Sequence, residues 1–264
     1  MLRSLFTSAT GMKAQQMYVD NVANNLANVN TTAFKRSRLD FQDLLYETLV
    51  SPGAESTQGF QMPTGLQIGS GVRQVATMKL FSQGLPQATG GRYDLTISGE
   101  GFFQVTHPGR NQTVYTRDGS FRLNSQGQLV TAEGYLLNPQ IAIPAGTVEV
   151  MIGNDGTVWA VPGANPDQRT NVGTLQLVSF PNPAGLESLG HNLYAESPAS
   201  GSVTTGNPGA NGLGEIRQGY LEGSNVDVVQ ELVNLIIAQR AYEVNSRAIR
   251  TSDQMLEQAN NIVT

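Results

Sequence analysis

The sequence predicts an α+β protein in which long helices at the two chain ends pair as a coiled-coil-like layer, with a central all-β domain and an extended arm between them. Two observations predict the helices. Residues 1–32 and 223–264 contain no proline, and their apolar residues recur at spacings of three and four. One observation predicts the β domain: all 12 prolines and most of the 29 glycines lie between these ends, among short β-prone runs.

The first element, residues 1–32, carries one apolar stripe that follows a heptad pattern and is interrupted only at Gln16. The stripe consists of Leu2, Leu5, Ala9, Met12, Val19, Ala23 and Leu26. Its small and medium side chains favour close packing between helices, so we expect it to form a helical seam.

Residues 33–70 form the second element, an extended arm. A stretch of this length without periodicity is unusual in a compact domain unless it has a function. The positions expected to shape the arm are Tyr46, Pro52, Gly53 and Pro63. We hypothesise that residues 46–63 wedge between neighbouring subunits and stiffen an assembly.

The third element is an all-β domain over residues 71–222. Strand-like runs such as 102–105 and 174–180 alternate with turn signals. Asp118-Gly119 and Asp155-Gly156 are typical of hairpin turns, and neither has the carboxylate spacing of a calcium loop.

The fourth element, residues 223–264, is a second long helix, for which Ser224 and Asp227 resemble a capping box. Its expected seam residues are Val228, Leu232, Leu235, Tyr242, Ile249 and Leu256.

Composition excludes several function classes. The chain has no cysteine and two histidines, which leaves little material for a metal centre. Its net charge of −5 argues against nucleic-acid binding, and it has no apolar run long enough for membrane insertion. The first residues do not form the apolar core of a cleaved signal peptide. We therefore expect no catalytic residue, metal or cofactor.

The two terminal helices indicate self-assembly. A two-helix layer leaves apolar stripes uncovered, and a single amphipathic helix is marginal in water. Packing the same pair from neighbouring copies covers them, and a head-to-tail contact that does not close produces a helical filament.

The ordered motifs of the chain resemble those of the flagellar rod and hook proteins. Near the N-terminus these are Ala-Thr-Gly-Met at 9–12 and Asn-Asn-Leu-Ala-Asn-Val-Asn-Thr-Thr at 24–32, followed by Phe-Lys-Arg at 34–36. Residues 95–103, 115–121, 218–226 and 238–243 match as well, so the resemblance extends over nearly the whole chain. The polar positions of these motifs, expected to make contacts in the assembly, are Asn24, Asn25, Asn28, Asn30, Thr31, Lys35, Gln239 and Arg240.

Within this family, the length and the arm pattern at 43–46, 52–53 and 63–73 resemble the distal-rod branch. The resemblance implies a non-enzymatic subunit of a drive shaft that crosses the periplasm and transmits torque to the hook. It implies export by the flagellar type III apparatus without cleavage. Implied partners are further copies, other rod proteins, the hook protein and the surrounding bushing rings. Ala33 departs from the family, which commonly has glycine there, and alanine resists positive φ.

The sequence leaves three alternative functions to weigh. The chain is also compatible with a proximal-rod or hook-like subunit. A cell-wall-cleaving enzyme needs a carboxylic acid of raised pKa beside a second carboxylate, for which Glu100 and Asp118 are the candidates. A carbohydrate-binding module is disfavoured, because Trp159 is the single tryptophan.

Overall fold

The computed structural model describes residues 2–53, 55–57, 60–61, 63–106, 112–163 and 169–263. The chain divides into two compact units, each described by itself. The helical unit comprises Met1–Ala27, Ser37–Met78 and Asp227–Thr264, and the β-rich unit comprises Asn28–Arg36 and Lys79–Val226. The chain therefore passes from one unit to the other four times. The α+β class is confirmed.

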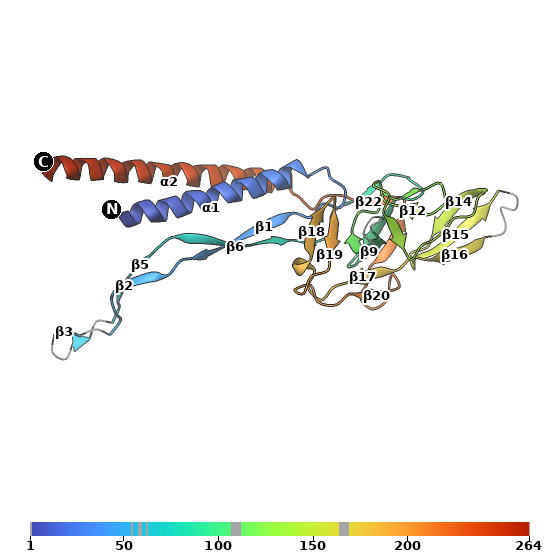
Figure 1. Ribbon diagram of the computed structural model, residues 1–264, viewed down its shortest axis with the longest axis horizontal. Helices are drawn as coiled ribbons and strands as arrows, with labels where there is room; N and C mark the ends of the chain where they lie inside the picture. The colour runs from blue at the N-terminus through green and yellow to red at the C-terminus, as the bar shows by residue number, and fades with distance from the viewer. Residues whose placement is uncertain are drawn as a thin grey trace. The chain divides into compact units, whose positions relative to one another are not determined.

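The helical unit contains two long helices, α1 (Leu2–Ala27) and α2 (Val228–Val263), which lie side by side and run antiparallel (Figure 1). α1 ends five residues before the expected position, at the asparagine-rich segment. α2 begins at Val228 rather than at Ser224, because Asp227 is its N-cap. The Asp227 carboxylate accepts hydrogen bonds from the N–H groups of Val229 and Gln230, at 2.9 and 3.2 Å. Neither helix combines the length and apolarity needed to cross a membrane.

Small side chains form the contact between the two helices. The hydroxyls of Ser4 and Ser252 are 3.2 Å apart. A Cβ added at Gly11 would lie 2.9 Å from the Asn245 amide nitrogen, so the backbone of α1 approaches α2 closely there. Ala238, Asn245 and Ser252 are seven residues apart and share one face of α2, on which Ala238 is fully buried.

The expected arm is a two-stranded antiparallel ribbon in the helical unit. Its strands are β1 (Ser37–Asp43), β2 (Tyr46–Val50), β3 (Glu55–Thr57), β4 (Phe60–Gln61), β5 (Leu66–Gly69) and β6 (Val72–Lys79). β1 pairs with β6, β2 with β5 and β3 with β4, so the chain returns along its own outward path (Figure 1). The β-rich unit consequently resumes at Lys79 and not at Gly71, since β6 belongs to the ribbon over nearly all its length.

The base of this ribbon packs on α1. The Asn25 side chain donates to the Ser37 carbonyl and accepts from the Ser37 N–H, both at 2.9 Å. The rings of Tyr18 and Phe41 meet edge to face at 6.2 Å. The Thr10 hydroxyl accepts a hydrogen bond from the Val72 N–H. One flank of α1 is therefore covered by the ribbon.

The β-rich unit is built around one larger sheet with the strand order β11-β12-β13-β9-β10-β19-β18, in which β17 joins β9 to β20. These strands are β9 (Phe102–Thr106), β10 (Thr113–Thr116), β11 (Arg122–Leu123), β12 (Leu129–Val130), β13 (Leu136–Asn138), β17 (Leu177–Ser179), β18 (Glu187–Gly190), β19 (Leu193–Ala195) and β20 (Thr204–Gly206). A three-stranded sheet contains β14 (Thr147–Ile152), β15 (Thr157–Pro162) and β16 (Thr170–Thr174). Two further pairs join β8 (Leu95–Ser98) to β21 (Glu215–Gln218), and β7 (Pro86–Ala88) to β22 (Tyr220–Glu222). A short 3₁₀ helix, η1, spans Pro183–Gly185.

The two Asp-Gly signals have different outcomes. Asp155-Gly156 connects β14 and β15, which pair with each other, and Gly156 has a φ of +82°. The hairpin expected at Asp118-Gly119 is wrong, because β10 and β11 on either side of it pair with other strands. Gly119 is needed for a different reason: the backbone of Leu95 leaves no room for a Cβ.

Candidate assembly surface

The larger residues of the expected apolar stripes lie on one open side of the helix pair. Ala9, two residues before Gly11, lies about 160° around α1 from the α2 contact and so falls outside this side. In α1, Ser4 and Gly11 contact α2. The stripe residues Leu5 and Met12 directly follow these two contact residues in the sequence. One residue corresponds to about 100° around a helix, so the stripe flanks the contact rather than filling it.

In α2 the stripe residues Leu235, Tyr242 and Ile249 each lie three residues before a residue of the face that contacts α1, which is about 60° around the helix in the same sense. In antiparallel helices, rotation in the same sense leads to the same side of the pair. The two stripes therefore face a common groove.

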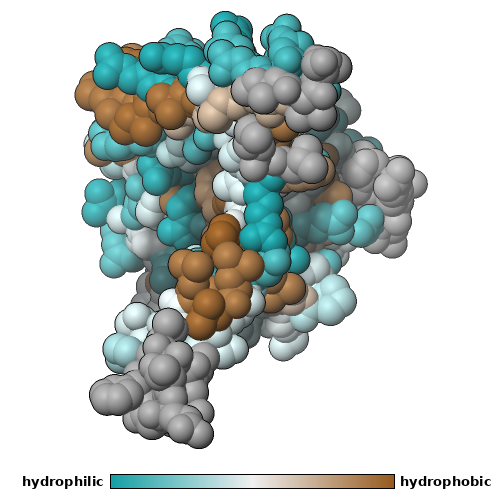
Figure 2. Space-filling model, turned by 90° about the vertical axis from the view of Figure 1, so that its left-hand side faces the viewer, coloured by the Kyte–Doolittle hydropathy of each residue, from teal (hydrophilic) through white to brown (hydrophobic). Residues whose placement is uncertain are grey.

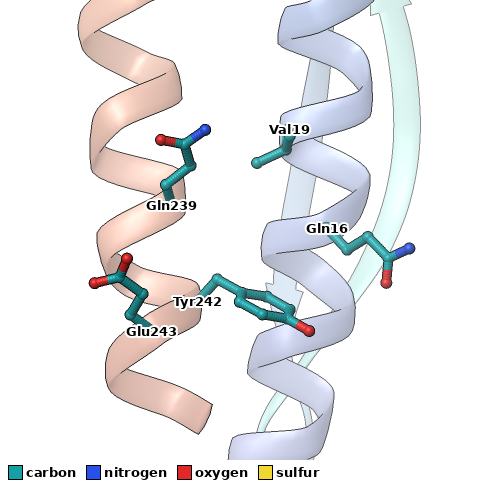
Figure 3. Close-up of a pocket in the computed structure, with 5 residues that line it drawn as sticks. All are labelled: Gln16, Val19, Gln239, Tyr242 and Glu243. Carbon is teal, nitrogen blue, oxygen red and sulfur yellow. The ribbon is translucent and has the colours of Figure 1, made fainter. Parts of the chain in front are cut away.

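A shallow hollow of about 400 Å³ marks the middle of this groove. Its lining residues are Gln16, Val19, Gln239, Tyr242 and Glu243. Figure 3 shows the Tyr242 ring and Val19 directed into the space between the helices, with Gln16 and Glu243 at opposite rims. Gln16, which interrupts the apolar stripe in the sequence, therefore lies beside the hollow.

Burial of the stripe residues is incomplete, as their flanking position requires. Leu5, Met12, Val19, Leu26, Leu235, Ile249 and Leu256 are half-buried, and Ala9, Ala23, Val228, Leu232 and Tyr242 are exposed. The side chain of Leu2 lies outside the described residues. Their role in contacts between copies remains a prediction.

The opposite face of α2 is also apolar near the start of the helix. Val229, Val233 and Ile236 are 71%, 44% and 51% exposed, and Arg240 continues the same row. Ile236 and Arg240 each stand two residues from the buried Ala238, about 160° around the helix from the face turned to α1. This row, 229, 233, 236 and 240, is named the back stripe.

The ribbon adds a third apolar surface. Leu45 is 89% exposed, and Tyr46, Leu49 and Leu66 are at least half exposed. Pro52 and Gly53 follow β2, and Pro63 precedes β5, so the positions expected to shape the arm interrupt both of its strands. Figure 2 shows apolar patches at the molecular surface, among hydrophilic side chains.

The polar motif residues have several different environments. Asn25 is buried and holds the start of β1, and Asn28 accepts a hydrogen bond from the Thr31 hydroxyl just beyond α1. Asn24, Asn30, Gln239 and Arg240 are exposed. Only Gln239 of these lines the groove hollow.

Lys35 lies in a buried charge cluster of the β-rich unit, where no sequence pattern placed it. Its Nζ is 2.6 Å from Glu222 Oε1 and donates to the Ser82 carbonyl at 2.8 Å. Arg117 donates to Glu222 Oε2 at 3.4 Å and to the Gly99 carbonyl at 2.8 Å. Burial lowers the pKa of Lys35, and the Glu222 carboxylate opposes that change.

The backbone around this cluster requires an unusual conformation at Ala33. Its φ is +56°, in the left-handed region, and its side chain is fully buried. The Ala33 N–H donates to the Glu222 carbonyl at 2.7 Å. The alanine therefore adopts the conformation for which glycine is favoured.

The two candidate acids of a cell-wall enzyme occupy structural positions. Asp118 accepts a hydrogen bond from the Ser120 N–H at 3.0 Å, and burial raises its pKa. Glu100 is exposed and forms an isolated bridge to Leu213. Among the described residues, no three histidine, aspartate or glutamate side chains gather as metal ligands.

Comparison with known proteins gives consistent matches along the chain. Residues 5–35 match the flagella basal body rod protein model, residues 96–160 the flagellar hook protein FlgE/F/G D1 domain, and residues 217–262 the flagellar basal body rod FlgEFG protein C-terminal model. The chain is 49% identical to the flagellar basal-body rod protein FlgG of Buchnera aphidicola subsp. Schizaphis graminum, with 99% of this chain and 100% of that protein covered. It is 44% identical to FlgG of Borreliella burgdorferi, with 99% of each covered.

Proposed function

The chain belongs to the family of flagellar basal-body rod proteins, and on this premise we propose that it is a structural subunit that polymerises helically into the distal rod and transmits torque to the hook. The observation that carries the proposal is the open groove of the helix pair. Two apolar stripes from opposite chain ends face the same side, and none of the described residues of the helical unit covers the hollow at Val19 and Tyr242. A surface of this kind is stabilised by packing against further copies.

The helix contact explains how the pair resists separation in such a polymer. Its central residues are small, so the backbones approach closely at Gly11, and the apolar side chains remain available on the flank. Torque then passes along packed helices, and the β-rich unit makes lateral and axial contacts outside them.

The ribbon is assigned a stiffening role in the same assembly. A two-stranded ribbon is marginally stable by itself in water. Leu45, Tyr46 and Leu66 are exposed on it and gain from burial against a neighbouring copy. Residues 46–63 thus act as a wedge between subunits.

Partners and location follow from the same role. The subunit contacts further copies of itself, other rod proteins, the hook protein and the bushing rings. It leaves the cytoplasm through the flagellar type III export apparatus without cleavage and forms the part of the basal body that crosses the periplasm. The role requires no catalytic residue, metal or cofactor.

The test uses a flagellated bacterium in which this chain replaces the resident rod protein. Purified basal bodies are expected to contain the chain as a repeated subunit of the rod, and cells are expected to swim. Leu235→Asp places a carboxylate in the α2 stripe and is expected to abolish rods, because a buried unpaired charge costs several kcal/mol. Leu189→Asp, on the exposed strand β18, is the control and is expected to leave rods intact. Normal rods with Leu235→Asp would contradict the stripe assignment, and basal bodies without the chain would contradict the function.

A further inference from the structure

We propose that the groove of the helix pair receives the back stripe of α2 from a second copy of this chain, with Arg240 of one copy paired to Glu243 of the other. The inference rests on the proposed function, since it names the surface through which two rod subunits meet. It concerns which two faces join and which charged pair sets their register.

The groove supplies an apolar floor with one acidic rim. Val19 and the Tyr242 ring face the hollow, and the amides of Gln16 and Gln239 are beside it. Glu243 is the single charged residue among those that line it. An occupant that fits this chemistry is an apolar helix face that ends in a cation.

The back stripe has this composition. Val229, Val233 and Ile236 are apolar, exposed and spaced by four and three, which is the spacing of a helix that packs in a groove. Arg240 follows four residues later on the same face. Arg240 and Glu243 are both exposed, and in the part of the chain that the structure describes neither has an ion-pair partner.

The two surfaces cannot meet within one chain. The back stripe lies about 160° around α2 from the face turned to α1, whereas the groove lies between α1 and α2. The contact must therefore join two copies, and it joins different surfaces. A contact of this type leaves one free groove and one free stripe at the ends of any assembly, so it propagates without closing.

The dimensions of the two surfaces agree. The back stripe extends over 12 residues, from Val229 to Arg240, which is about 17 Å of helix at 1.5 Å per residue. On the groove side, Leu232 to Glu243 covers the same length, and its apolar members Leu232 and Leu235 precede the hollow. The apolar parts and the charged ends thus fall in the same order when the two α2 helices run parallel.

Charge reversal in separate copies tests the pair. Because Arg240 and Glu243 are three residues apart on one helix, reversing both in one chain would favour a pair within the helix as well as a pair between copies. Arg240→Glu and Glu243→Arg are therefore made in different chains and expressed alone or together in cells without the resident rod protein. Neither chain alone has an opposite-charge pair, but an alternating mixture has one at each contact.

Each variant alone is expected to lower the number of rods per cell by at least about tenfold, since like charges that face each other in an interface oppose association. Co-expression is expected to restore the number to within about threefold of the wild type. Glu187→Arg, an exposed change in the β-rich unit, is the control and should have no effect. Circular dichroism of each purified variant, expected to match the wild-type spectrum, separates loss of assembly from loss of folding.

Three results would overturn the inference: rods at wild-type numbers with either single variant, no recovery on co-expression, or a wild-type response to Val233→Asp in the back stripe. If the wild-type chain forms rods, any of these results contradicts the proposed contact between groove and back stripe and leaves the rod function standing. If the wild-type chain itself is absent from rods, the proposed function is contradicted.

Discussion

Lys35 and Glu222, 187 positions apart in the chain, form a fully buried ion pair whose Nζ and Oε1 atoms are 2.6 Å apart. The same Oε1 accepts the Gly84 N–H at 2.9 Å, and Asn225 nearby binds the carbonyls of Leu80 and Ser82. Segments 33–36, 80–84 and 222–225 are thereby joined in one cluster. These are the segments of the β-rich unit from which the chain passes to the helical unit.

Lys35→Met should lower the free energy of unfolding of the β-rich unit by about 3 kcal/mol, because it leaves the buried Glu222 carboxylate with the Gly84 N–H and only the longer Arg117 contact as a cation. Urea titration followed by the fluorescence of Trp159, which lies in β15 of the same unit, measures the change. The control Arg122→Met, at an exposed residue, should change the free energy of unfolding by less than about 0.5 kcal/mol. Lys35→Met combined with Glu222→Leu should cost less than the sum of the two single variants, although Arg117 then loses its carboxylate as well. Strict additivity would contradict the pairing of Lys35 with Glu222.

Tyr194 should make the β-rich unit sensitive to alkali, since burial raises its pKa to about 12 from the usual 10.0. Above pH 10 the unfolded chain loses this proton before the folded chain does, so the contribution is complete below pH 10 and is lost as the pH rises to about 12. In the Tyr194→Phe variant, the free energy of unfolding should fall by roughly 2 kcal/mol less between pH 9 and 12 than in the wild type, as measured by urea titration. Tyr220→Phe, on an exposed tyrosine, is the comparison; an equal effect there would contradict the assignment.

Ala33 should tolerate glycine better than any larger residue. Ala33→Gly relieves the positive φ but loses a buried methyl group, and each effect is about 1 kcal/mol, so the net change should be below about 1 kcal/mol. Ala33→Val should destabilise by more than about 2 kcal/mol, because a β-branched side chain is strongly disfavoured at φ +56° and the site is buried. Chemical denaturation of the wild type and the two variants measures their order of stability. A valine variant as stable as the wild type would contradict this prediction.

Shortening the ribbon should change the polymer without disturbing the fold. Tyr46 and Gly69 are directly paired, so residues 46–69 can be replaced by an Asn-Gly turn that closes the remaining hairpin. If the ribbon stiffens the assembly, electron microscopy should show curved polymers instead of straight ones. Leu49→Ser with Leu66→Ser keeps the ribbon and should give an intermediate curvature. Polymers that remain equally straight after the deletion would exclude a stiffening role.

Local pattern was sufficient for the elements whose causes are local. Absence of proline and regular apolar spacing predicted both long helices, and turn residues such as Asp155-Gly156 predicted strand connections. The same dependence on local pattern explains the wrong hairpin prediction. Asp118-Gly119 has the composition of a hairpin turn, but the strands on either side of it pair with partners elsewhere in the sheet.

By itself, the sequence determined the fold class, the two apolar stripes and the family resemblance, because each is written in the spacing or order of neighbouring residues. Only the tertiary structure decided that small residues such as Gly11 make the helix contact and that the stripes remain on its flank. It also decided that the arm returns as β6 and that Lys35 is paired with Glu222. These outcomes depend on which distant segments meet, and a periodic pattern specifies a face without specifying what that face packs against.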